Sequence, residues 1–500
     1  MMKQAVRFGL LSVLLGASLQ ALASGPKTLT ILHTNDMHAQ FLPKEALWVR
    51  ETPKPRVGGF ARIKELVDSI RAVEAATLVL DAGDVMTGNP ITDRTYRGAE
   101  GGALFAMMNM IGYDAWCPGN HDFDISQDNL RKLVSIASFP ALSANLVNDQ
   151  GDFPVGNKPY AIIERGGLRI GIIGLMSPEL YSLVNQNNLV GIRVLSPVET
   201  VRKYIAVLGG KTDLMILLTH QGVDLDSALA AEISGVDVIV GGHSHTRLRT
   251  PKVVNGIIIV QTGSSTENLG ELQLTVDDGR VVNYSGKLIP TWVTRKPRPN
   301  ELTALVDSMQ VEIDREYSEV IAILGSDWKR SEFQSAIGTF IADAQRIAAA
   351  ADVGFMNNYG IRKDQAAGPM TKRDLFEILP FRNTLTTFAM SGKQLAGVVR
   401  FMLEKHPAIQ IAGMTATFKR RPDNSVEFRD MRVGGEPLDE AKTYTCAASD
   451  YMVGEARRYL GLEIPQPYFL HQTMFEAVEK QIRRLRIIEP KVLYAIEEEH

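Results

Sequence analysis

The sequence predicts an α/β domain followed by a smaller α+β domain, with a helical linker between them. Three observations lead to this prediction. The chain has 500 residues, which is too many for one ordinary hydrophobic core. From Lys27 to about Pro290, apolar strands alternate with amphipathic helices, a pattern typical of α/β folds. A stretch rich in proline and charge, TWVTRKPRPN, then separates this region from the rest.

The N-terminal 23 residues have the pattern of a signal peptide that is removed. Lys3 and Arg7 give a positively charged start, an apolar stretch over residues 8–19 follows, and residues 21–23 read Ala-Leu-Ala. Cleavage is therefore expected after Ala23. The apolar stretch is shorter than the roughly 20 residues that span a bilayer. We expect a periplasmic or secreted protein with no membrane anchor after signal removal.

Composition and charge limit the classes of partner. With 45% apolar and 22% charged residues, the chain resembles a soluble globular protein. Its formal net charge is −3, and loss of Lys3 and Arg7 would make it more negative. The sequence has no run of basic residues with interleaved aromatics, so a nucleic-acid polymer is not expected as a partner. The number of subunits is not indicated.

The first domain, expected over residues 24–292, should contain a buried sheet flanked by helices. Its predicted strands cover residues 29–33, 77–81, 115–117, 141–146, 169–175, 214–219, 236–240 and 257–261. Its clearest predicted helices cover residues 62–73, 103–110 and 198–208. In such folds the loops that leave the strand ends carry the chemistry.

Residues 293–317 are predicted to form the linker, with a connecting helix over 301–317 and a hinge between about Pro290 and Ser318. The second domain, expected over 318–500, should contain helices over 335–350 and 392–405, a strand leading into a turn over 353–359, and further short strands. The two cysteines, Cys117 and Cys446, fall in different domains, so we expect two separate buried thiols. An oxidising compartment would permit a disulfide.

Side chains of the metal-binding type follow five predicted strands, in the segments LTILHTNDMH, TLVLDAGD, CPGNHDFD, LMILLTHQG and VDVIVGGHSH. The candidate ligands are Asp36, His38, Asp84, Asn120, His220, His243 and His245. Imidazole, carboxylate and amide groups without a thiolate suit hard-to-borderline divalent metals such as Zn, Mn or Co. Two such ions, about 3.5–4 Å apart, form a clamp for in-line displacement at phosphorus.

Spacing suggests how these groups converge. Asp36 and His38 are two residues apart, which on an extended segment directs both side chains to one side. His243 and His245 repeat this spacing. Asp84 follows Gly83, which allows close backbone approach, and its carboxylate can bridge two cations. Any one of these pieces alone would more often be structural; the five together point to a metal site.

His121 is predicted to be the catalytic histidine. It is adjacent to the ligand Asn120, and Asp124, three residues later, is within reach to orient its imidazole. His33 lies just before the cluster and is expected to be a packed or supporting histidine. His406, His471 and His500 belong to no motif.

The order DMH, GD, GNHDFD, TH and GHSH resembles the calcineurin-type metallophosphoesterases, and specifically the 5′-nucleotidase/UDP-sugar hydrolase family. The resemblance covers essentially the whole mature chain. It implies a four-layer α/β/β/α catalytic domain and a nucleotide-binding C-terminal domain, with substrate between them. One metal would be held by Asp36, His38, Asp84 and His245. The other would be held by Asp84, Asn120, His220 and His243. His121 and Asp124 would form the catalytic dyad.

The second domain carries the expected substrate-binding residues. In MNNYGIR a turn projects Asn357 and Arg362, and a guanidinium suits phosphate recognition. In ILPFRN, Phe381 could stack on a base. These segments are similar to the family's nucleotide-binding motifs. A gapless alignment puts Tyr459 at the family's second stacking aromatic, but the glycine-rich loop before it is replaced by GEARR.

The sequence therefore predicts dinuclear-metal-dependent hydrolysis of nucleotide phosphate esters, as a 5′-nucleotidase that yields nucleoside and phosphate. Because the loop before Tyr459 departs from the family, alternative substrates stay open. These alternatives are a 2′,3′-cyclic-nucleotide phosphodiesterase/3′-nucleotidase, a UDP-sugar hydrolase and a thiosulfohydrolase. A non-catalytic secreted binding protein on the same scaffold is an alternative from another class.

Overall fold

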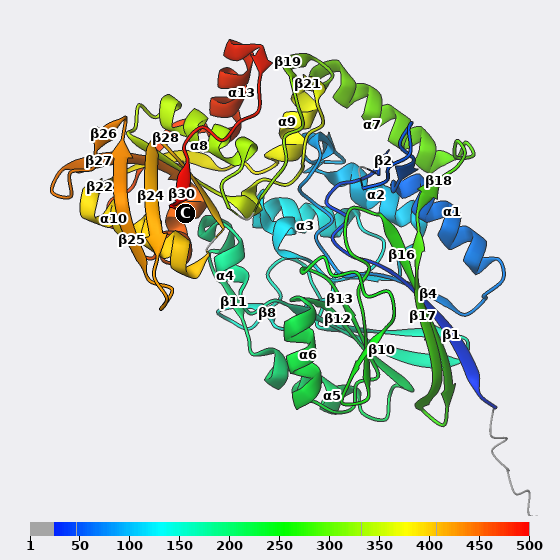
Figure 1. The fold of residues 1–500 in the computed structure, drawn as a ribbon. Helices are drawn as coiled ribbons and strands as arrows, with labels where there is room; N and C mark the ends of the chain where they lie inside the picture. The colour runs from blue at the N-terminus through cyan, green and yellow to red at the C-terminus, as the bar shows by residue number, and fades with distance from the viewer. Residues whose placement is uncertain (1–24, 47, 332, 407, 500) are drawn as a thin grey trace, which may run out of the picture.

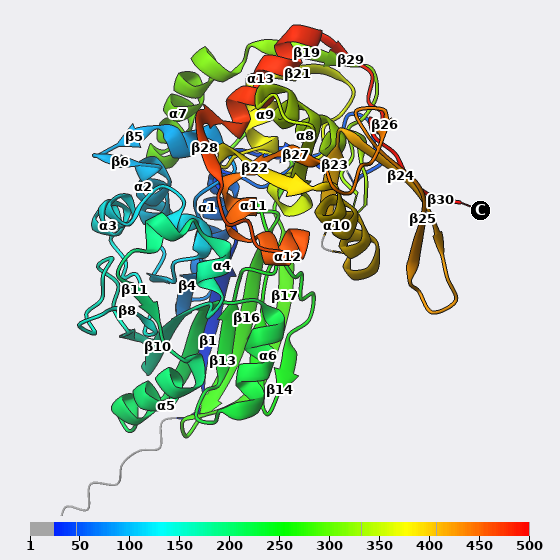
Figure 2. The same cartoon turned by 90° about the vertical axis from the view of Figure 1, so that its left-hand side faces the viewer.

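The computed structural model describes residues 25–46, 48–331, 333–406 and 408–499. Two lobes are visible in Figures 1 and 2, the first built from the N-terminal half and the second from the C-terminal part. The predicted signal peptide lies outside the described residues. Within the described residues, no helix combines the length and apolar character needed to cross a bilayer.

Two mixed sheets, each with a parallel part and antiparallel strands at its edge, form the centre of the first lobe. The first has the order β17-β16-β1-β4-β7. Its strands are β1 Lys27–Thr34, β4 Thr77–Asp81, β7 Ala115–Trp116, β16 Asn268–Asp277 and β17 Arg280–Pro290. The second has the order β14-β15-β13-β12-β10-β9. Its strands are β9 Tyr160–Arg165, β10 Leu168–Met176, β12 Leu214–His220, β13 Val238–Gly241, β14 Lys252–Val254 and β15 Ile257–Val260.

Helices and short strands complete the first lobe. The helices are α1 Phe60–Arg71, α2 Gly102–Ile111, α3 Gln127–Ile136, α4 Leu180–Leu183, α5 Pro197–Leu208 and α6 Val223–Glu232. The 3-10 turns are η1 Pro90–Asp93, η2 Asn120–Phe123 and η3 Gln186–Leu189. The short strands are β2 Lys44–Glu45, β3 Arg56–Val57, β5 Thr95–Tyr96, β6 Ala99–Glu100, β8 Leu146–Asn148, β11 Ile192–Val194 and β18 Trp292–Val293.

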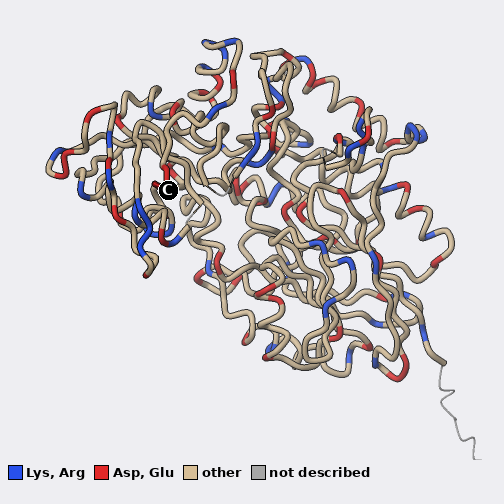
Figure 3. The backbone as a smooth tube through the Cα atoms, in the orientation of Figure 1, with Lys and Arg blue, Asp and Glu red and all other residues tan. Residues whose placement is uncertain are grey.

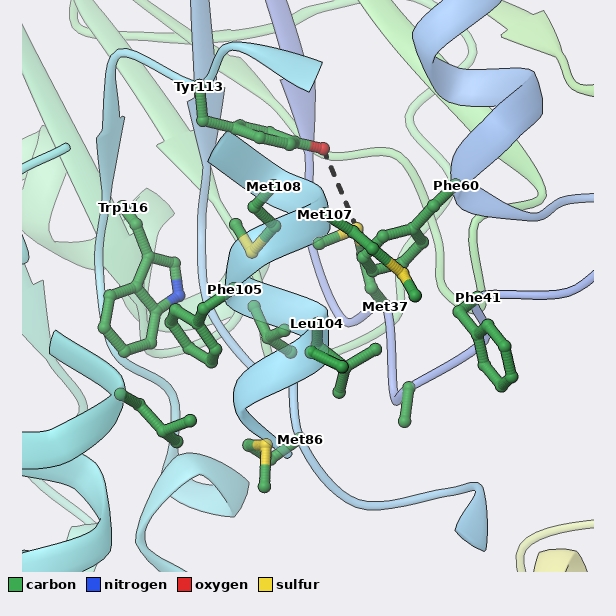
Figure 4. Close-up of a cluster of buried hydrophobic side chains, with 14 of the residues drawn as sticks. Met37, Phe41, Phe60, Met86, Leu104, Phe105, Met107, Met108, Tyr113 and Trp116 are labelled. Carbon is green, nitrogen blue, oxygen red and sulfur yellow. Dashed lines mark hydrogen bonds between the residues drawn. The ribbon is translucent and has the colours of Figure 1, made fainter. Parts of the chain in front are cut away.

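Successive side chains of a strand point to opposite faces of its sheet, and this alternation defines four layers. In β4, Leu78 and Leu80 join the core between the two sheets, whereas Val79 faces the opposite way, into the core under α1 and α2. In β12, Ile216 lies between the sheets, and Leu217 packs toward α5 and α6. The arrangement is therefore α/β/β/α, and the predicted fold class is confirmed. Figure 4 shows part of the core under α2.

Most predicted elements of the first domain form within a residue or two of their expected ends, with one clear exception. The strand predicted over residues 141–146 is wrong: only an isolated bridge joins Ala141 to Trp116, and a short strand, β8, begins at Leu146. The segment crosses between the sheets, where Asn145 donates to the backbone carbonyl of Met176 at 2.8 Å. In this segment, side-chain hydrogen bonds thus take the place of some of the backbone hydrogen bonds that a strand would form with its neighbour.

The connecting helix α7 Glu301–Tyr317 has the predicted ends. Asn300 caps it by accepting a hydrogen bond from the Thr303 N–H at 2.9 Å. Its buried face, which includes Val306 and Ile313, belongs to the same core as α1 and α2. α7 also contacts α9 (Lys372–Ile378) of the second lobe, because the Tyr317 and Phe376 rings lie 5.7 Å apart and Lys372 pairs with Glu316 at 3.2 Å. The hinge between about Pro290 and Ser318 stays a prediction.

The second lobe is α+β, as predicted. Its largest sheet has the order β23-β20-β27-β22-β28. The strands of the whole second lobe are β19 Val320–Leu324, β20 Val353–Asn357, β21 Gly368–Thr371, β22 Thr384–Ser391, β23 Ile409–Ala412, β24 Met414–Arg420, β25 Val426–Val433, β26 Glu436–Pro437, β27 Thr443–Ser449, β28 Tyr468–Thr473, β29 Ile487–Ile488 and β30 Ile496–Glu498. Its helices are α8 Ala336–Ala348, α9 Lys372–Ile378, α10 Gly392–Lys405, α11 Asp450–Gly454, α12 Ala456–Leu460 and α13 Met474–Leu485, with the turn η4 Asn358–Gly360.

Both cysteines are free and buried, as predicted. Cys117 follows β7 and its thiol faces the Leu175 carbonyl at 3.4 Å, whereas Cys446 lies in β27 of the second lobe. Basic and acidic residues are interspersed over both lobes in the view of Figure 3, which agrees with the absence of a basic run in the sequence.

Close packing between the sheets makes Gly174 of β10 a test of this architecture. A Cβ atom there would lie 2.0 Å from the Leu142 carbonyl oxygen. We expect Gly174→Ala to lower the thermal unfolding temperature by at least about 3 °C, because overpacking costs roughly 1–3 kcal/mol. The matched control is Gly397→Ala, at an exposed position of α10 where a Cβ meets nothing within 4 Å. Unfolding is measured by circular dichroism. An equal decrease in unfolding temperature in the two variants would contradict this packing.

Candidate metal centre and active site

Four parallel strands end at one edge of the central layers, and their loops bring the candidate ligands together. In the first sheet, Thr34 at the end of β1 is in register with Asp81 at the end of β4. In the second sheet, Thr219 near the end of β12 is in register with Gly241 at the end of β13. One group of three ligand-type residues consists of Asp36, His38 and His245. The other consists of Asp84, His220 and His243.

In the first group, Asp36 Oδ1 lies 3.3 Å from His245 Nε2 and 3.9 Å from His38 Nε2. The two imidazole nitrogens, Nε2 of His38 and Nε2 of His245, are 3.0 Å apart. Three ligand atoms therefore converge on one point.

In the second group, Asp84 Oδ2 lies 3.2 Å from His220 Nε2. Asn120 Oδ1 completes this group, at 3.3 Å from His220 Nε2 and 3.0 Å from His243 Nδ1. Asp84 Oδ2 also lies 3.9 Å from His38 Nε2, in the first group. Asp84 is thus placed between the two groups, as a bridging ligand must be.

Backbone carbonyls set the tautomers of two histidines. His38 Nδ1 donates to the Thr87 carbonyl at 3.1 Å, and His220 Nδ1 donates to the Ala82 carbonyl at 2.6 Å. A carbonyl can only accept, so Nδ1 carries the proton and Nε2 is left as a ligand atom. Although burial opposes the charged form, Asp84 raises the pKa of His220 to about 10. A cation bound here would compete with that proton.

The donor set fits a pair of divalent cations. Asp36 and Asp84 are buried, at 0% and 1% exposure, and two carboxylates buried side by side need compensating positive charge. Among the described residues, Asp36 Oδ1 has no hydrogen-bond partner. A bound cation would satisfy this orphaned oxygen and the convergent imidazole nitrogens.

The backbone at the ligands differs from the extended geometry expected from their spacing. Asp36, His38, Asp84, His243 and His245 all have positive φ, between 47° and 77°. Side chains two residues apart therefore meet through left-handed turns and not through strand alternation. Strained non-glycine residues cluster at functional sites, and here they lie directly beyond the strand ends.

Gly83 shows how tightly these loops approach one another. Its φ is +92°, and a Cβ atom there would lie 2.8 Å from His220 Nδ1 and 2.7 Å from the Cys117 carbonyl. Only glycine combines this conformation with this contact distance. The expected close backbone approach at Gly83 is therefore present.

His121 and Asp124 form the predicted pair. His121 Nδ1 lies 2.8 Å from Asp124 Oδ2, and the His121 N–H donates to Asp84 Oδ1 at 2.8 Å. Burial opposes protonation of the ring, but the charge of Asp124 raises the pKa of His121. The imidazole is thus held beside both ligand groups without being placed in either.

His33 is a packed histidine, as expected. It is 1% exposed, lies across the ladder from Gly270 in β16, and burial lowers its pKa to about 3. It stays neutral and supports β1 from behind the site.

Sequence reasoning missed Asp122, which holds the site loops together. Its carboxylate accepts the backbone N–H groups of Gly119, Asp84, Val85 and Met86 at 2.7–3.1 Å. The only signal for this role was its position directly after His121 in the GNHDFD segment.

The second lobe brings two predicted substrate-binding residues to the site. Arg362 Nη2 lies 3.2 Å from His38 Nε2, and its guanidinium lies 5.7 Å from the centre of the Phe381 ring. The Phe381 ring centre is in turn 5.4 Å from that of His121. Arg362 and Phe381 therefore face both the ligand groups and the pair His121–Asp124.

The other two predicted substrate-binding residues lie differently. Asn357 ends β20 and is 3% exposed, beneath the turn that carries Arg362. Tyr459 is 1% exposed, in the core of the second lobe, with its ring 6.2 Å from that of Tyr451. This placement disagrees with the expectation that Tyr459 stacks on a base, because α12 turns the ring inward.

Comparisons with known proteins agree with this fold and assign a family. Residues 29–247 match the family model for calcineurin-like phosphoesterases, and residues 311–461 match the model for the 5′-nucleotidase C-terminal domain. A 5′-nucleotidase of Vibrio cholerae is 31% identical, with 87% of this chain and 88% of the relative covered. Protein UshA of Salmonella pullorum is 30% identical, with 85% and 84% covered. The crystal structure of a Thermus thermophilus 5′-nucleotidase precursor superimposes with a TM-score of 0.81 at 27% identity, covering 95% of this chain and 100% of that one.

The layered fold and the paired ligand groups define a metal-dependent phosphoesterase of the calcineurin-like class, whose members use divalent metals. Within that class, the chain belongs to the family of the 5′-nucleotidases and UshA proteins. It is a hydrolase that acts on nucleotide phosphate esters in a metal-dependent manner.

The position of Asp84 predicts the effect of its neutralisation. We expect Asp84→Asn to lower the bound metal from two ions to one or fewer per chain, because one amide oxygen cannot bridge two cations. The measurement is elemental analysis after equilibration with Mn²⁺ or Zn²⁺.

The control for Asp84→Asn is Asp226→Asn. Asp226 is equally buried, and its Oδ1 accepts from both Thr219 at 2.8 Å and Gln221 at 2.9 Å. An asparagine oxygen can keep both bonds, so metal content should stay at two. Full metal content in Asp84→Asn would show that the carboxylate does not bridge.

Proposed function

We propose that this enzyme is a 5′-nucleotidase, which cleaves a nucleoside 5′-monophosphate into nucleoside and phosphate. The observation that carries the proposal is the meeting of Arg362 and Phe381 of the second lobe with His38 and His121 of the first. A cationic fork and an aromatic ring beside a phosphoesterase centre match the two ends of a nucleotide. The guanidinium suits the phosphate, and the ring suits the base.

In this proposal, Asp36, His38, Asp84 and His245 hold one divalent cation, and Asp84, Asn120, His220 and His243 hold the other. When bound, two such cations supply Lewis-acid stabilisation of the phosphoryl oxygens and activation of water. The donor chemistry suits Zn, Mn or Co.

His121 is proposed as the group that assists departure of the nucleoside oxygen. Its Nδ1–H donates to Asp124, so Nε2 is the atom left to give a proton to the leaving oxygen. The bond between phosphorus and that oxygen breaks, and water supplies the new oxygen of the phosphate. A positioned acid of this kind contributes roughly 10²–10⁴-fold in rate.

Arg362 and Phe381 are proposed to bind substrate, with Asn357 supporting the turn that carries Arg362. Domain bounds complete the proposal: a signal peptide over residues 1–23, a catalytic domain over 24–292, a linker over 293–317 and a substrate-binding domain over 318–500. The signal-like N-terminus supports export to the periplasm or beyond the cell. The substrate is a small molecule, and no nucleic-acid polymer is proposed as a partner.

A hydrolysis screen tests the function. It follows released phosphate and, by chromatography, the loss of each nucleotide, because opening a cyclic ester or splitting UDP-glucose into UMP and glucose 1-phosphate releases no inorganic phosphate. Metal-stripped protein is mixed with nucleoside 5′-monophosphates, 3′-monophosphates, 2′,3′-cyclic nucleotides and UDP-glucose, and Zn²⁺, Mn²⁺ or Co²⁺ is added back singly. We expect metal-dependent phosphate release, fastest with a 5′-monophosphate. Preference for a cyclic nucleotide or for UDP-glucose would favour those alternative esters. No hydrolysis with any cation would contradict a nucleotidase.

The proposed role of Phe381 predicts that its replacement weakens binding of the base but not of the phosphate. We expect Phe381→Leu to raise KM for a nucleoside monophosphate by about tenfold, because base–aromatic stacking contributes roughly 1–3 kcal/mol. KM for ribose 5-phosphate, which has no base, should change less than twofold.

The control for Phe381→Leu is Tyr459→Leu, which also removes an aromatic ring, but one that is 1% exposed. In the folded variant KM for both substrates should be unchanged, although the lost packing should lower the unfolding temperature. An increase in KM for the nucleotide with Tyr459→Leu but not with Phe381→Leu would reverse the assignment of the base site.

A further inference from the structure

Thr87 lies in the loop after Asp84 and contacts His38 and Asp124, the partner of His121, by different atoms. Its hydroxyl donates to Asp124 Oδ2 at 2.7 Å, and the same oxygen accepts from His121 Nδ1 at 2.8 Å. Its backbone carbonyl accepts from His38 Nδ1 at 3.1 Å. Thr87 is 7% exposed. One buried residue is thus bound to both the acid pair and a candidate metal ligand.

The backbone of Thr87 is strained. Its φ is +63°, a conformation in which a β-branched residue is a genuine outlier. Glycine or asparagine would be more comfortable there, so threonine stands at this position against its conformational preference. Strain of this kind is a reason to look for a functional role, and the hydroxyl is the feature that glycine would lack.

Neighbouring contacts leave the Asp124 side chain as the one loose part of the pair. Asn188 Nδ2 donates to the backbone carbonyls of Phe123 and Asp124, both at 3.0 Å, which holds their backbone. His121 is anchored through its N–H to Asp84. The Asp124 side chain is 23% exposed, so water could compete for its oxygens. A buried hydroxyl bound to the oxygen that faces His121 removes that freedom.

We propose that Thr87 is a positioning residue for hydrolysis, acting through Asp124 to hold the His121 imidazole in its working orientation. The proposal rests on the role given above to the pair His121–Asp124. It also explains the strained loop: Asp122 accepts the N–H groups of Val85 and Met86, at 3.1 Å each, and so carries the turn that brings Thr87 to Asp124. If Thr87 only filled space in the core, a side chain of the same shape without a hydroxyl would serve equally well.

Matched variants separate the hydroxyl from the shape. Thr87→Val keeps the β-branched shape and the backbone strain but removes the donor, whereas Thr87→Ser keeps the donor. With a nucleoside 5′-monophosphate and Mn²⁺, we expect Thr87→Val to lower kcat by about 10–100-fold, as loss of a supporting hydrogen bond does elsewhere. KM and the two bound metals should be unchanged, and Thr87→Ser should retain activity within about threefold.

A control and a double-variant cycle test the route of action. Thr92→Val is the control, because the Thr92 hydroxyl also donates from a buried site, at 2.9 Å, but to the Asn89 carbonyl. It should leave kcat unchanged. On an Asp124→Ala background, Thr87→Val should cost no further activity, since its partner is gone. An equal further loss there, or equal activity in Thr87→Ser and Thr87→Val, would overturn the proposal.

A readout without turnover keeps this test independent of the proposed function. In metal-free protein, nuclear magnetic resonance of labelled histidine follows exchange of the His121 Nδ1 proton with water. We expect faster exchange in Thr87→Val than in wild type or Thr87→Ser; equal rates would overturn the proposal. If wild type hydrolyses no nucleotide, the proposed function fails, and the exchange measurement still decides the role of Thr87. If Thr87→Val does not fold, comparison of Thr87→Ala with Thr87→Ser carries the same test.

Discussion

The structure depends on holding like charges together in a buried place. Asp36 and Asp84 are almost inaccessible to water, and each lies close to imidazoles that can serve as ligands. Parallel strands make this possible, because their ends present loops to one edge while the ladders and the inter-sheet core hold them still. Asp122 then ties the Asp84 loop to the His121 loop through four backbone N–H groups. The centre is therefore built from backbone constraint first and from ligand chemistry second.

The second lobe completes a site that the first lobe cannot form alone. Arg362 reaches His38, and Phe381 lies beside His121. Arg382, next to Phe381 in sequence, pairs across the lobes with Asp93 at 2.7 Å and with Glu100 at 3.2 Å. Such exposed pairs contribute only about 0.2–1 kcal/mol each. Apolar packing adds to these pairs, since Phe376 of α9 joins the core under α1 and α2, with its ring 5.7 Å from that of Tyr317 in α7.

Sequence patterns predicted what depends on local periodicity and on motif order. The layered fold, helix α7 and the meeting of the ligand residues were all predicted. Left-handed turns at Asp36 and His243 were not, because spacing alone does not report φ. Tyr459 was misplaced for a different reason: alignment position says nothing about which face of α12 is buried. Asp122 and Thr87 act through backbone and side-chain hydrogen bonds between distant loops, and no periodic signal marks such contacts.

The two thiols have a practical consequence. Cys117 and Cys446 are unpaired and sit in the interiors of separate lobes, where burial raises the pKa of both. A thiol kept protonated is a poor nucleophile, and neither lobe relies on a covalent cross-link for its shape. Maturation of this chain accordingly needs no thiol oxidase, and active protein should be obtainable from the reducing cytoplasm of an ordinary expression host.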